Sequence, residues 1–589
     1  MSSMPPDKPR WRKSAEAERV ALWRAALCLF LLSAVLIARQ FTNPNFPSCV
    51  IDDSVLHMSW VQQFSASLAQ GYWLPRWLPD SNGGYGSPIF IFYSPLAYYL
   101  TALLKFGTGS VIVAMKLARF LALFLSGLAM FIYARGLVHS KAALVVALVY
   151  VALPFHVLDI SYWTLYAEPW AWIWFPVILM SLRQMLDADR WNSRSMRMFA
   201  VCYGGLILTH LVSAYMFSFV IAGYAVFRSN RKRLLIALGR VGLAAGLGMA
   251  LAAFFLLPAC YEQRFVHIDY ITLRPEFNFR NTFLFFPAAD FIQNAPFQSR
   301  TTALLQFITL LQTAWAATGL LLILRTGTVG SVVKGELGFA AGVGLSCLFL
   351  MSRLSVWVWD WVPRLPQIQF STRWLSVFSW AVALMGGLSL DLFRKRRSQS
   401  WLNLLHFALA FIMVLGTGVL ILSGCFLSEE HNERARQNVQ NAPEYNPRAM
   451  TDWKRQVIWP SDAPFTLLQG QAHVRIERWT AENRSLVVEA ETPVRIRIRL
   501  LNYPGWSVFD NGVVMSLGVD LTSGAMLLDV PQGEHRIEIK FQTTPWRTGA
   551  LILSFVSGIV LFGMSATDLF GRGIKSQPDG GAFASIDSG

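Results

Sequence analysis

Long apolar runs, separated by short polar stretches, form the main pattern of the chain. A helix needs about 20 apolar residues to cross a bilayer, and we expect twelve such spans. Lys and Arg gather after every second run, as they do in the cytoplasmic loops of membrane proteins. The pattern predicts a polytopic α-helical membrane protein with both termini in the cytoplasm. The expected spans are 22–38, 110–134, 142–158, 168–186, 198–211, 212–227, 234–257, 303–324, 337–352, 373–392, 402–427 and 548–570.

The region 198–227 is the least regular part of this pattern. Its length suits one long tilted helix, but basic clusters flank it on both sides and require two short helices. The polar pair Thr209-His210 is where we expect the two helices to divide.

The segment 428–547 follows a different pattern. Val494, Ile496 and Ile498 alternate with arginines, and a similar run follows His535. A period of two is typical of strands with one buried face, and Asn511-Gly512 is a hairpin signal. We expect a small antiparallel, sandwich-like β domain outside the membrane. The expected organisation is a cytoplasmic N-terminus (1–21), a transmembrane domain (22–427), the β domain (428–547), a last helix (548–570) and a disordered cytoplasmic tail (571–589).

Composition supports a membrane protein and argues against a nucleic-acid-binding protein. The 589 residues are 54% hydrophobic and 15% charged, whereas soluble domains carry about 25% charged residues. In a soluble protein the net charge of +16 would suggest nucleic acid. Here the basic clusters between apolar spans report topology, so we expect membrane lipids as partners and no nucleic acid.

The six cysteines show no metal-ligand spacing. Cys49 and Cys260 are both expected on the outer side of the membrane. A disulfide between them is one open possibility if that compartment is oxidising.

The first outside loop, 39–109, carries the most distinctive ionisable residues. Asp52 and Asp53 lie just beyond the first span, and His57 shares the helical face of Asp53. Acidic groups at a membrane boundary are costly to desolvate and are often functional. Asp53, or in second place Asp52, could serve as a general base; the alternative is that both cap the following helix. The run Pro95–Phe106 is too short to span and predicts a helix lying in the interface.

Three further groups lie at the outer ends of expected spans. Glu168 opens the fourth span, Asp159 closes the third, and His210 lies at the break between the fifth and the sixth. Each could help to form a site with Asp53. Structural readings stay open, because a Glu before Pro169 is also good helix-start chemistry.

Arginines also occur in outside loops, where charge bias gives topology no reason to place them. Arg373 begins the tenth span, and the loop 258–302 holds Arg264, Arg274 and Arg280. Guanidinium groups bind phosphate well, so we expect these four to bind the phosphate of an anionic ligand. For Arg373, interfacial anchoring is the alternative.

Four stretches of the first outside loop are distinctive in sequence: Asp53-(x3)-His57, Gly71–Asp80, Gly84–Pro88 and Phe92–Tyr99. Together they resemble the bacterial integral membrane proteins described as 6-pyruvoyl-tetrahydropterin synthase-related. The His-triad zinc site of that soluble synthase is not found in the sequence. These proteins in turn resemble the C-type (GT-C) glycosyltransferase superfamily, which includes protein O-mannosyltransferases and lipid A aminoarabinose transferases. Asn502–Trp506 and Val530–His535 resemble the C-terminal domain of related proteins implicated in teichoic-acid glycosylation.

The resemblance implies a catalytic Asp in the first extracytoplasmic loop, matched by Asp53, and a second acidic residue matched by Glu168. Two positions depart from the family pattern. Relatives often have Arg-Gly where this chain has Trp163-Thr164, and Gln-Phe-Pro-Trp-Arg where it has Gln369–Arg373. The first departure removes an expected phosphate partner.

With this resemblance we expect an inverting GT-C-like glycosyltransferase in the bacterial inner membrane. It would move a sugar from a polyprenyl-phosphate donor to an envelope glycan, lipid or protein on the outer side. Asp53 and Glu168 would be catalytic, with Asp52, His57, Asp159 and His210 in supporting roles. No metal ligands are assigned, and a divalent metal ion stays open as a cofactor. The alternatives are a lipid-linked glycan transporter or flippase, and a non-catalytic scaffold of an envelope-polysaccharide assembly complex.

Overall fold

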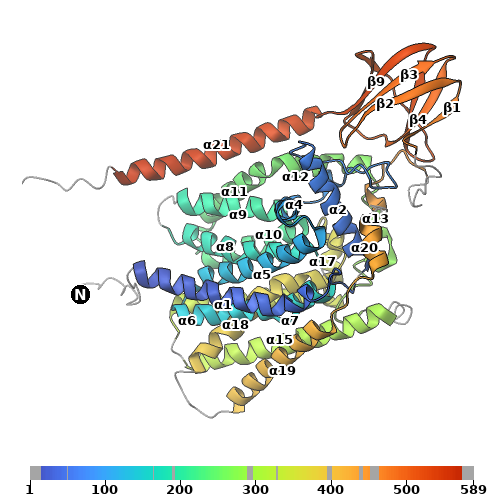
Figure 1. Cartoon of the computed structure of the whole chain (residues 1–589). Coiled ribbons are helices and arrows are strands. Elements are labelled where there is room, and N and C mark those ends of the chain that lie inside the picture. The colour runs from blue at the N-terminus through green and yellow to red at the C-terminus, as the bar shows by residue number, and fades with distance from the viewer. Residues whose placement is uncertain are drawn as a thin grey trace, which may run out of the picture.

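The computed structural model consists of a helical bundle and a smaller β sandwich that lies beyond one end of it (Figure 1). A mostly helical membrane protein with a C-terminal antiparallel β region was expected from the sequence, and this fold class is confirmed. The structure describes residues 15–49, 51–163, 165–188, 193–287, 296–326, 329–393, 401–436, 442–451 and 463–573.

Helices occupy all twelve segments in which a span was expected. Within the described ranges, ten segments are long and apolar enough to cross a membrane, and α8 and α9 are not among them. The count of twelve spans therefore stays a prediction. The helices are α1 (Ala15–Phe41), α5 (Val111–Arg135), α6 (Ser140–Ala152) followed by α7 (Pro154–Leu158) and the π-helical turn η1 (Asp159–Trp163), α8 (Glu168–Leu186), α9 (Ser193–Thr209), α10 (Leu211–Arg228), α11 (Leu234–Leu251) followed by α12 (Ala253–Glu262), α15 (Pro296–Thr326), α16 (Ser331–Leu350), α18 (Trp374–Phe393), α19 (Trp401–Ser423) and α21 (Pro545–Gly573).

Local sequence explains several helix ends. The Ser110 hydroxyl accepts a hydrogen bond from the Val113 N–H and so caps α5. Helix α6 ends before Pro154, because the residue preceding a proline is disfavoured in the helical region. The expected division of 198–227 is confirmed: α9 ends at Thr209, His210 is extended, and α10 begins at Leu211.

Short helices cover the end of the bundle nearest the sandwich, where Figure 1 shows α2, α13 and α20. Their aromatic core includes Trp60, Phe64, Phe90 and Tyr98, all buried. The first outside loop is therefore a packed layer between the bundle and the sandwich. The elements of this layer are α2 (Ile51–Ala69), α3 (Ile89–Phe92), α4 (Leu96–Thr108), α13 (Tyr270–Leu273), α17 (Val356–Trp361) and α20 (Glu429–Arg436).

The sandwich is built from two antiparallel sheets. Alternation places Val494, Ile496 and Ile498 in its core, as the period-two pattern indicated. The turn between β5 (Trp506–Asp510) and β6 (Val513–Met515) has Asn511 and Gly512 at positive φ, 48° and 85°, as a two-residue hairpin requires. One sheet has the order β1 (Phe465–Gln469), β4 (Val494–Leu501), β8 (Ala525–Val530), β7 (Gly518–Val519); the other has β2 (Ala472–Trp479), β3 (Asn483–Ala490), β9 (Gly533–Phe541), β5 (Trp506–Asp510), β6 (Val513–Met515).

A buried ion pair joins the sandwich to the bundle. Arg547, at the start of α21, donates two hydrogen bonds of 2.8 Å to Glu262 at the end of α12. The Tyr503 hydroxyl, from the loop after β4, donates to the same carboxylate at 2.8 Å. Since Glu262 and Arg547 are fully buried, this cluster fixes how the sandwich meets the membrane domain.

Candidate active site

Asp53 lies in the first turn of α2, the helix that Figure 1 shows at the end of the bundle nearest the sandwich. Its carboxylate oxygen Oδ2 is 3.6 Å from Nε2 of His57, one helical turn later. The Asp53 side chain is 39% exposed, whereas that of His57 is 5% exposed. Asp53 is therefore accessible to solvent on one side, and on its other side it faces the buried His57 ring. Asp52 lies in the same turn, and its side chain falls outside what the structure describes.

Aromatic side chains surround His57. Its Nδ1 is 2.6 Å from the Tyr98 hydroxyl, and the ring of Tyr166 stacks on it with centroids 5.4 Å apart. Burial lowers the pKa of His57, and the Asp53 charge opposes this effect. Burial also raises the pKa of Tyr98 well above its usual value. A neutral imidazole with its proton on Nε2 suits this arrangement, because it accepts from Tyr98 and turns an N–H toward Asp53.

Glu168 is the first residue of α8 and is buried. Pro169 in the first turn is pre-organised for a helix start, which explains why the helix begins there. Arg373 and the Ser376 hydroxyl are among the groups that act on the Glu168 charge. The charges of Asp53, Arg373 and Glu168 all act on the Tyr93 hydroxyl, so the three side chains lie around this one phenol. Burial raises the pKa of Tyr93 above its usual value, and the phenol stays protonated.

Asp159 and His210 also belong to this neighbourhood. Asp159, the first residue of η1, is fully buried and interacts electrostatically with Glu168, Arg119 and Asp53. The Nδ1 of His210 is 2.7 Å from the Ser213 hydroxyl. The Arg373 charge acts on the His210 ring, and His57 also lies within electrostatic range of it.

Hydrogen bonds of the Ser94 side chain link the break between α9 and α10 to the first outside loop. The Ser94 hydroxyl donates to the Ile207 carbonyl at 2.9 Å and accepts from the Leu211 N–H at 3.1 Å. These bonds satisfy backbone groups that the break would leave unpaired. They also place His210 beside the loop that carries Tyr93.

Of the four arginines expected to bind phosphate, Arg373 is the one that lies among the carboxylates. It donates to the Gln369 side chain at 3.3 Å. Gln369 has a positive φ of 67°, an uncommon conformation for a residue with a side chain and one that is often found at functional sites. The departure Gln369–Arg373 from the family pattern thus coincides with a strained backbone.

The other three arginines have partners elsewhere. Arg264 stacks on the Tyr261 ring, 3.6 Å from its centroid. Arg280 pairs with Asp360 at 2.6 Å. Arg274 pairs with Glu276, but its charge also acts on Glu444. Their predicted role in binding phosphate has no support from these contacts.

Glu444 is a neighbour of Asp53 that sequence reasoning missed. Burial raises its pKa, the Asp53 charge adds to this, and Arg274 opposes it. The adjacent Tyr445 stacks on Phe92, with centroids 5.5 Å apart and planes 6° apart. No motif or charge pattern marks this segment, which reaches the site only because the chain returns from α19 across the bundle end.

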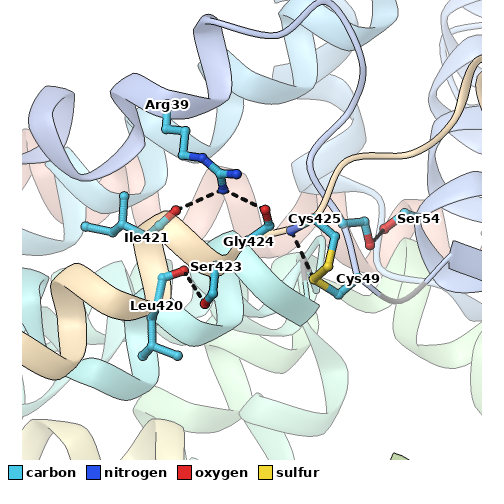
Figure 2. The surroundings of a disulfide bond; sticks show 9 residues. Arg39, Cys49, Ser54, Leu420, Ile421, Ser423, Gly424 and Cys425 are labelled. Carbon is cyan, nitrogen blue, oxygen red and sulfur yellow. Dashed lines mark hydrogen bonds between the residues drawn. A yellow bond between two sulfur atoms is a disulfide. The ribbon is translucent and has the colours of Figure 1, made fainter.

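The one disulfide in the described part of the chain joins Cys49 to Cys425, with Cα atoms 4.9 Å apart (Figure 2). The pairing of Cys49 with Cys260 is therefore wrong, and Cys260 is a free thiol in α12. The expected span 402–427 had placed Cys425 inside the membrane. Helix α19 ends at Ser423 instead, which leaves Cys425 beyond the helix and beside the loop that carries Cys49.

Comparisons with known proteins place the chain among membrane proteins. A family model described as "6-pyruvoyl-tetrahydropterin synthase related domain; membrane protein" matches residues 90–430, more than half of the chain. An uncharacterized protein of Lactococcus lactis subsp. cremoris (strain MG1363) is 25% identical over 242 residues, which cover 39% of this chain and 38% of that protein. The chain thus spans well under half of this curated relative.

Solved structures also include chains similar to this one. Arabinofuranosyltransferase AftD from Mycobacteria has a TM-score of 0.42 at 15% identity, covering 69% of this chain and 26% of that one. Oligosaccharyltransferase AglB from Archaeoglobus fulgidus, in complex with an inhibitory peptide and a dolichol-phosphate, has a TM-score of 0.40 at 14% identity. The match covers 73% of this chain and 57% of that one. ArnT from Cupriavidus metallidurans, bound to undecaprenyl phosphate, has a TM-score of 0.29 at 15% identity. The match covers 64% of this chain and 78% of that one. These TM-scores are too low to support an argument about activity.

Proposed function

The chain belongs to the 6-pyruvoyl-tetrahydropterin synthase-related family of membrane proteins, and we propose that it is a glycosyltransferase. It moves a sugar from a polyprenyl-phosphate donor to an envelope glycan, lipid or protein at the outer face of the bacterial inner membrane. One observation carries this proposal: Asp53, Glu168 and Arg373 come from three distant segments and lie around Tyr93. A half-exposed carboxylate, a buried carboxylate and a cation are the groups that such a transfer requires.

Asp53 is the general base of the proposed reaction. It takes the proton from the acceptor hydroxyl as the oxygen attacks the anomeric carbon, and the bond from that carbon to the phosphate oxygen breaks. A direct attack inverts the configuration at the anomeric carbon. His57 holds Asp53 from its buried side, so the carboxylate keeps one free edge for the acceptor.

Arg373 receives the charge that develops on the departing phosphate. Guanidinium groups match phosphate oxygens in geometry and charge, and a site with little water strengthens the interaction. Arg373 lies within electrostatic range of Glu168, and in the proposed reaction this carboxylate attracts the guanidinium before the donor binds. Glu168 itself would contact the sugar rather than the acceptor.

Two substitutions separate these roles. The assay measures release of undecaprenyl phosphate by mass spectrometry, with the purified protein in lipid nanodiscs, a panel of undecaprenyl-phosphate sugars, and envelope extract as acceptor. Asp53→Asn should lower kcat by about 10²–10⁴-fold without changing the affinity for undecaprenyl phosphate. Arg373→Ala should instead weaken binding of undecaprenyl phosphate by about 10- to 100-fold.

Asp529→Asn is the matched control. It makes the same chemical change in an exposed ion pair with Arg495 on the sandwich, and should leave both quantities unchanged. Normal turnover by Asp53→Asn would overturn the role of Asp53 as the base, and a wild type without turnover would argue for a scaffold or a transporter instead of a transferase.

A further inference from the structure

The disulfide between Cys49 and Cys425 lies at the start of the helix that carries Asp53. Helix α2 begins at Ile51, and Asp53 falls in its first turn. The Ser54 hydroxyl, in the same turn, donates to the Ser48 hydroxyl at 2.7 Å. The backbone on which the disulfide acts is thus tied directly to the turn that holds the proposed base (Figure 2).

Backbone hydrogen bonds make Cys49 a junction of three segments. The Ser48 N–H donates to the Cys425 carbonyl at 3.0 Å, and the Leu427 N–H donates to the Phe46 carbonyl at 2.9 Å. These bonds form a short antiparallel bridge between the first outside loop and the chain leaving α19. The Cys49 N–H donates to the Tyr162 carbonyl at 2.9 Å.

Each segment at this junction leads to the site. Tyr162 belongs to η1, which carries Asp159 and runs on toward Glu168. The chain after Cys425 forms α20, which packs against α2. A shift at the disulfide would therefore move Asp53 relative to the acidic groups on its far side.

The disulfide is not needed to keep α1 and α19 together. Arg39, at the end of α1, donates to the Ile421 and Gly424 carbonyls at 3.0 and 2.6 Å (Figure 2). Because these outer helix ends are already joined, loss of the disulfide would loosen the link to α2 rather than unfold the bundle.

We propose that the Cys49–Cys425 disulfide is a positioning element for Asp53, so that sugar transfer depends on its oxidation. This inference rests on the proposed function. Its formation joins the two Sγ atoms, releases two protons and passes two electrons to a disulfide-bearing oxidant outside the cytoplasm, which becomes a dithiol. The reduced protein keeps its fold and its donor site but holds Asp53 loosely.

The experiment compares the wild type with a Cys49→Ser/Cys425→Ser variant in the same nanodisc assay, each before and after treatment with dithiothreitol. The double variant should lose about 100-fold in kcat, the order of effect of a 1 Å misplacement, while KM for the undecaprenyl-phosphate sugar stays within about threefold. Dithiothreitol should bring the wild type to the same level and leave the double variant unchanged. A Cys28→Ser/Cys260→Ser variant, which alters two exposed free thiols, should behave as the wild type does.

The outcomes separate the inference from the proposed function. Full kcat in the double variant, or in the reduced wild type, overturns the positioning role, even if Asp53→Asn is inactive. An equal fall in kcat and in undecaprenyl phosphate binding would indicate a general structural role and also overturns it. If Asp53→Asn keeps full turnover, the proposed function fails and this inference fails with it. Should the double variant not fold, reduction of the purified wild type still decides the matter.

Discussion

His57 lies between Asp53 and the aromatic rings of Tyr98 and Tyr166. Its protonation state decides whether Asp53 faces a neutral imidazole or a cation. Burial holds the pKa of His57 below its ordinary value of 6.5. Near neutral pH the ring is therefore uncharged and offers Asp53 an N–H without neutralising its charge.

This depressed pKa predicts how stability depends on pH. Below about pH 6.5 the unfolded chain protonates this histidine while the folded protein resists protonation, so stability is lost as the pH falls. Melting temperatures of the wild type and His57→Gln, measured between about pH 7.5 and pH 5.5, should show the wild type losing more stability on acidification. A difference that is constant across this range would contradict the arrangement.

Among elements, α8 and α18 contact each other and bring Glu168 and Arg373 to the same region. Glu168 begins α8 and Arg373 directly precedes α18. The carboxylate and an incoming phosphate would compete for the same guanidinium. In the proposed site the Glu168 charge favours this position of Arg373 at the cost of some donor affinity.

Glu168→Gln therefore has an expected effect of unusual sign. Removing the negative charge should strengthen binding of undecaprenyl phosphate by roughly tenfold, about 1.4 kcal/mol, while transfer slows. Binding to nanodisc-held protein can be followed by native mass spectrometry. Weaker binding in Glu168→Gln would show that Glu168 supports the phosphate site instead of competing for it.

The sequence predicts features that depend on neighbouring residues, but not features that depend on contacts between distant segments. Apolar length and basic clusters located the helices, and the polar pair Thr209-His210 located a break that the structure has at the same place. Asp53, Glu168 and Arg373 stood out because charge at a membrane boundary needs a reason. Glu444 and the partner of Cys49 could not be found in this way, because their proximity to the site depends on the path of the chain after α19. A four-residue error in the end of that helix, expected at 427 and found at Ser423, hid Cys425.

At the scale of the whole molecule, one buried cluster couples the sandwich to the bundle. Glu262 accepts hydrogen bonds from both Arg547 and Tyr503. Trp77 of the first outside loop packs against Trp506 of the sandwich, with centroids 5.3 Å apart. The loop that carries Asp53 thus lies between two bodies that are held to each other by these contacts.

Breaking that cluster should be costly. Glu262→Ala leaves the buried Arg547 charge unpaired and should lower the free energy of unfolding by about 3–5 kcal/mol. Tyr503→Phe removes a single hydrogen bond to the same carboxylate and should cost about 1.5–3 kcal/mol. Thermal unfolding in detergent compares the two variants. If Tyr503→Phe is the more damaging, the ion pair is not what holds the sandwich.

The central claim is that Asp53 removes the acceptor proton while the donor is held elsewhere. The most direct test is a single turnover of undecaprenyl-phosphate sugar already bound to the protein, started by adding the acceptor extract. We expect Asp53→Asn to bind donor as tightly as the wild type but to transfer sugar about 10²–10⁴ times more slowly, with Asp529→Asn unchanged. Transfer by Asp53→Asn at the wild-type rate would contradict it.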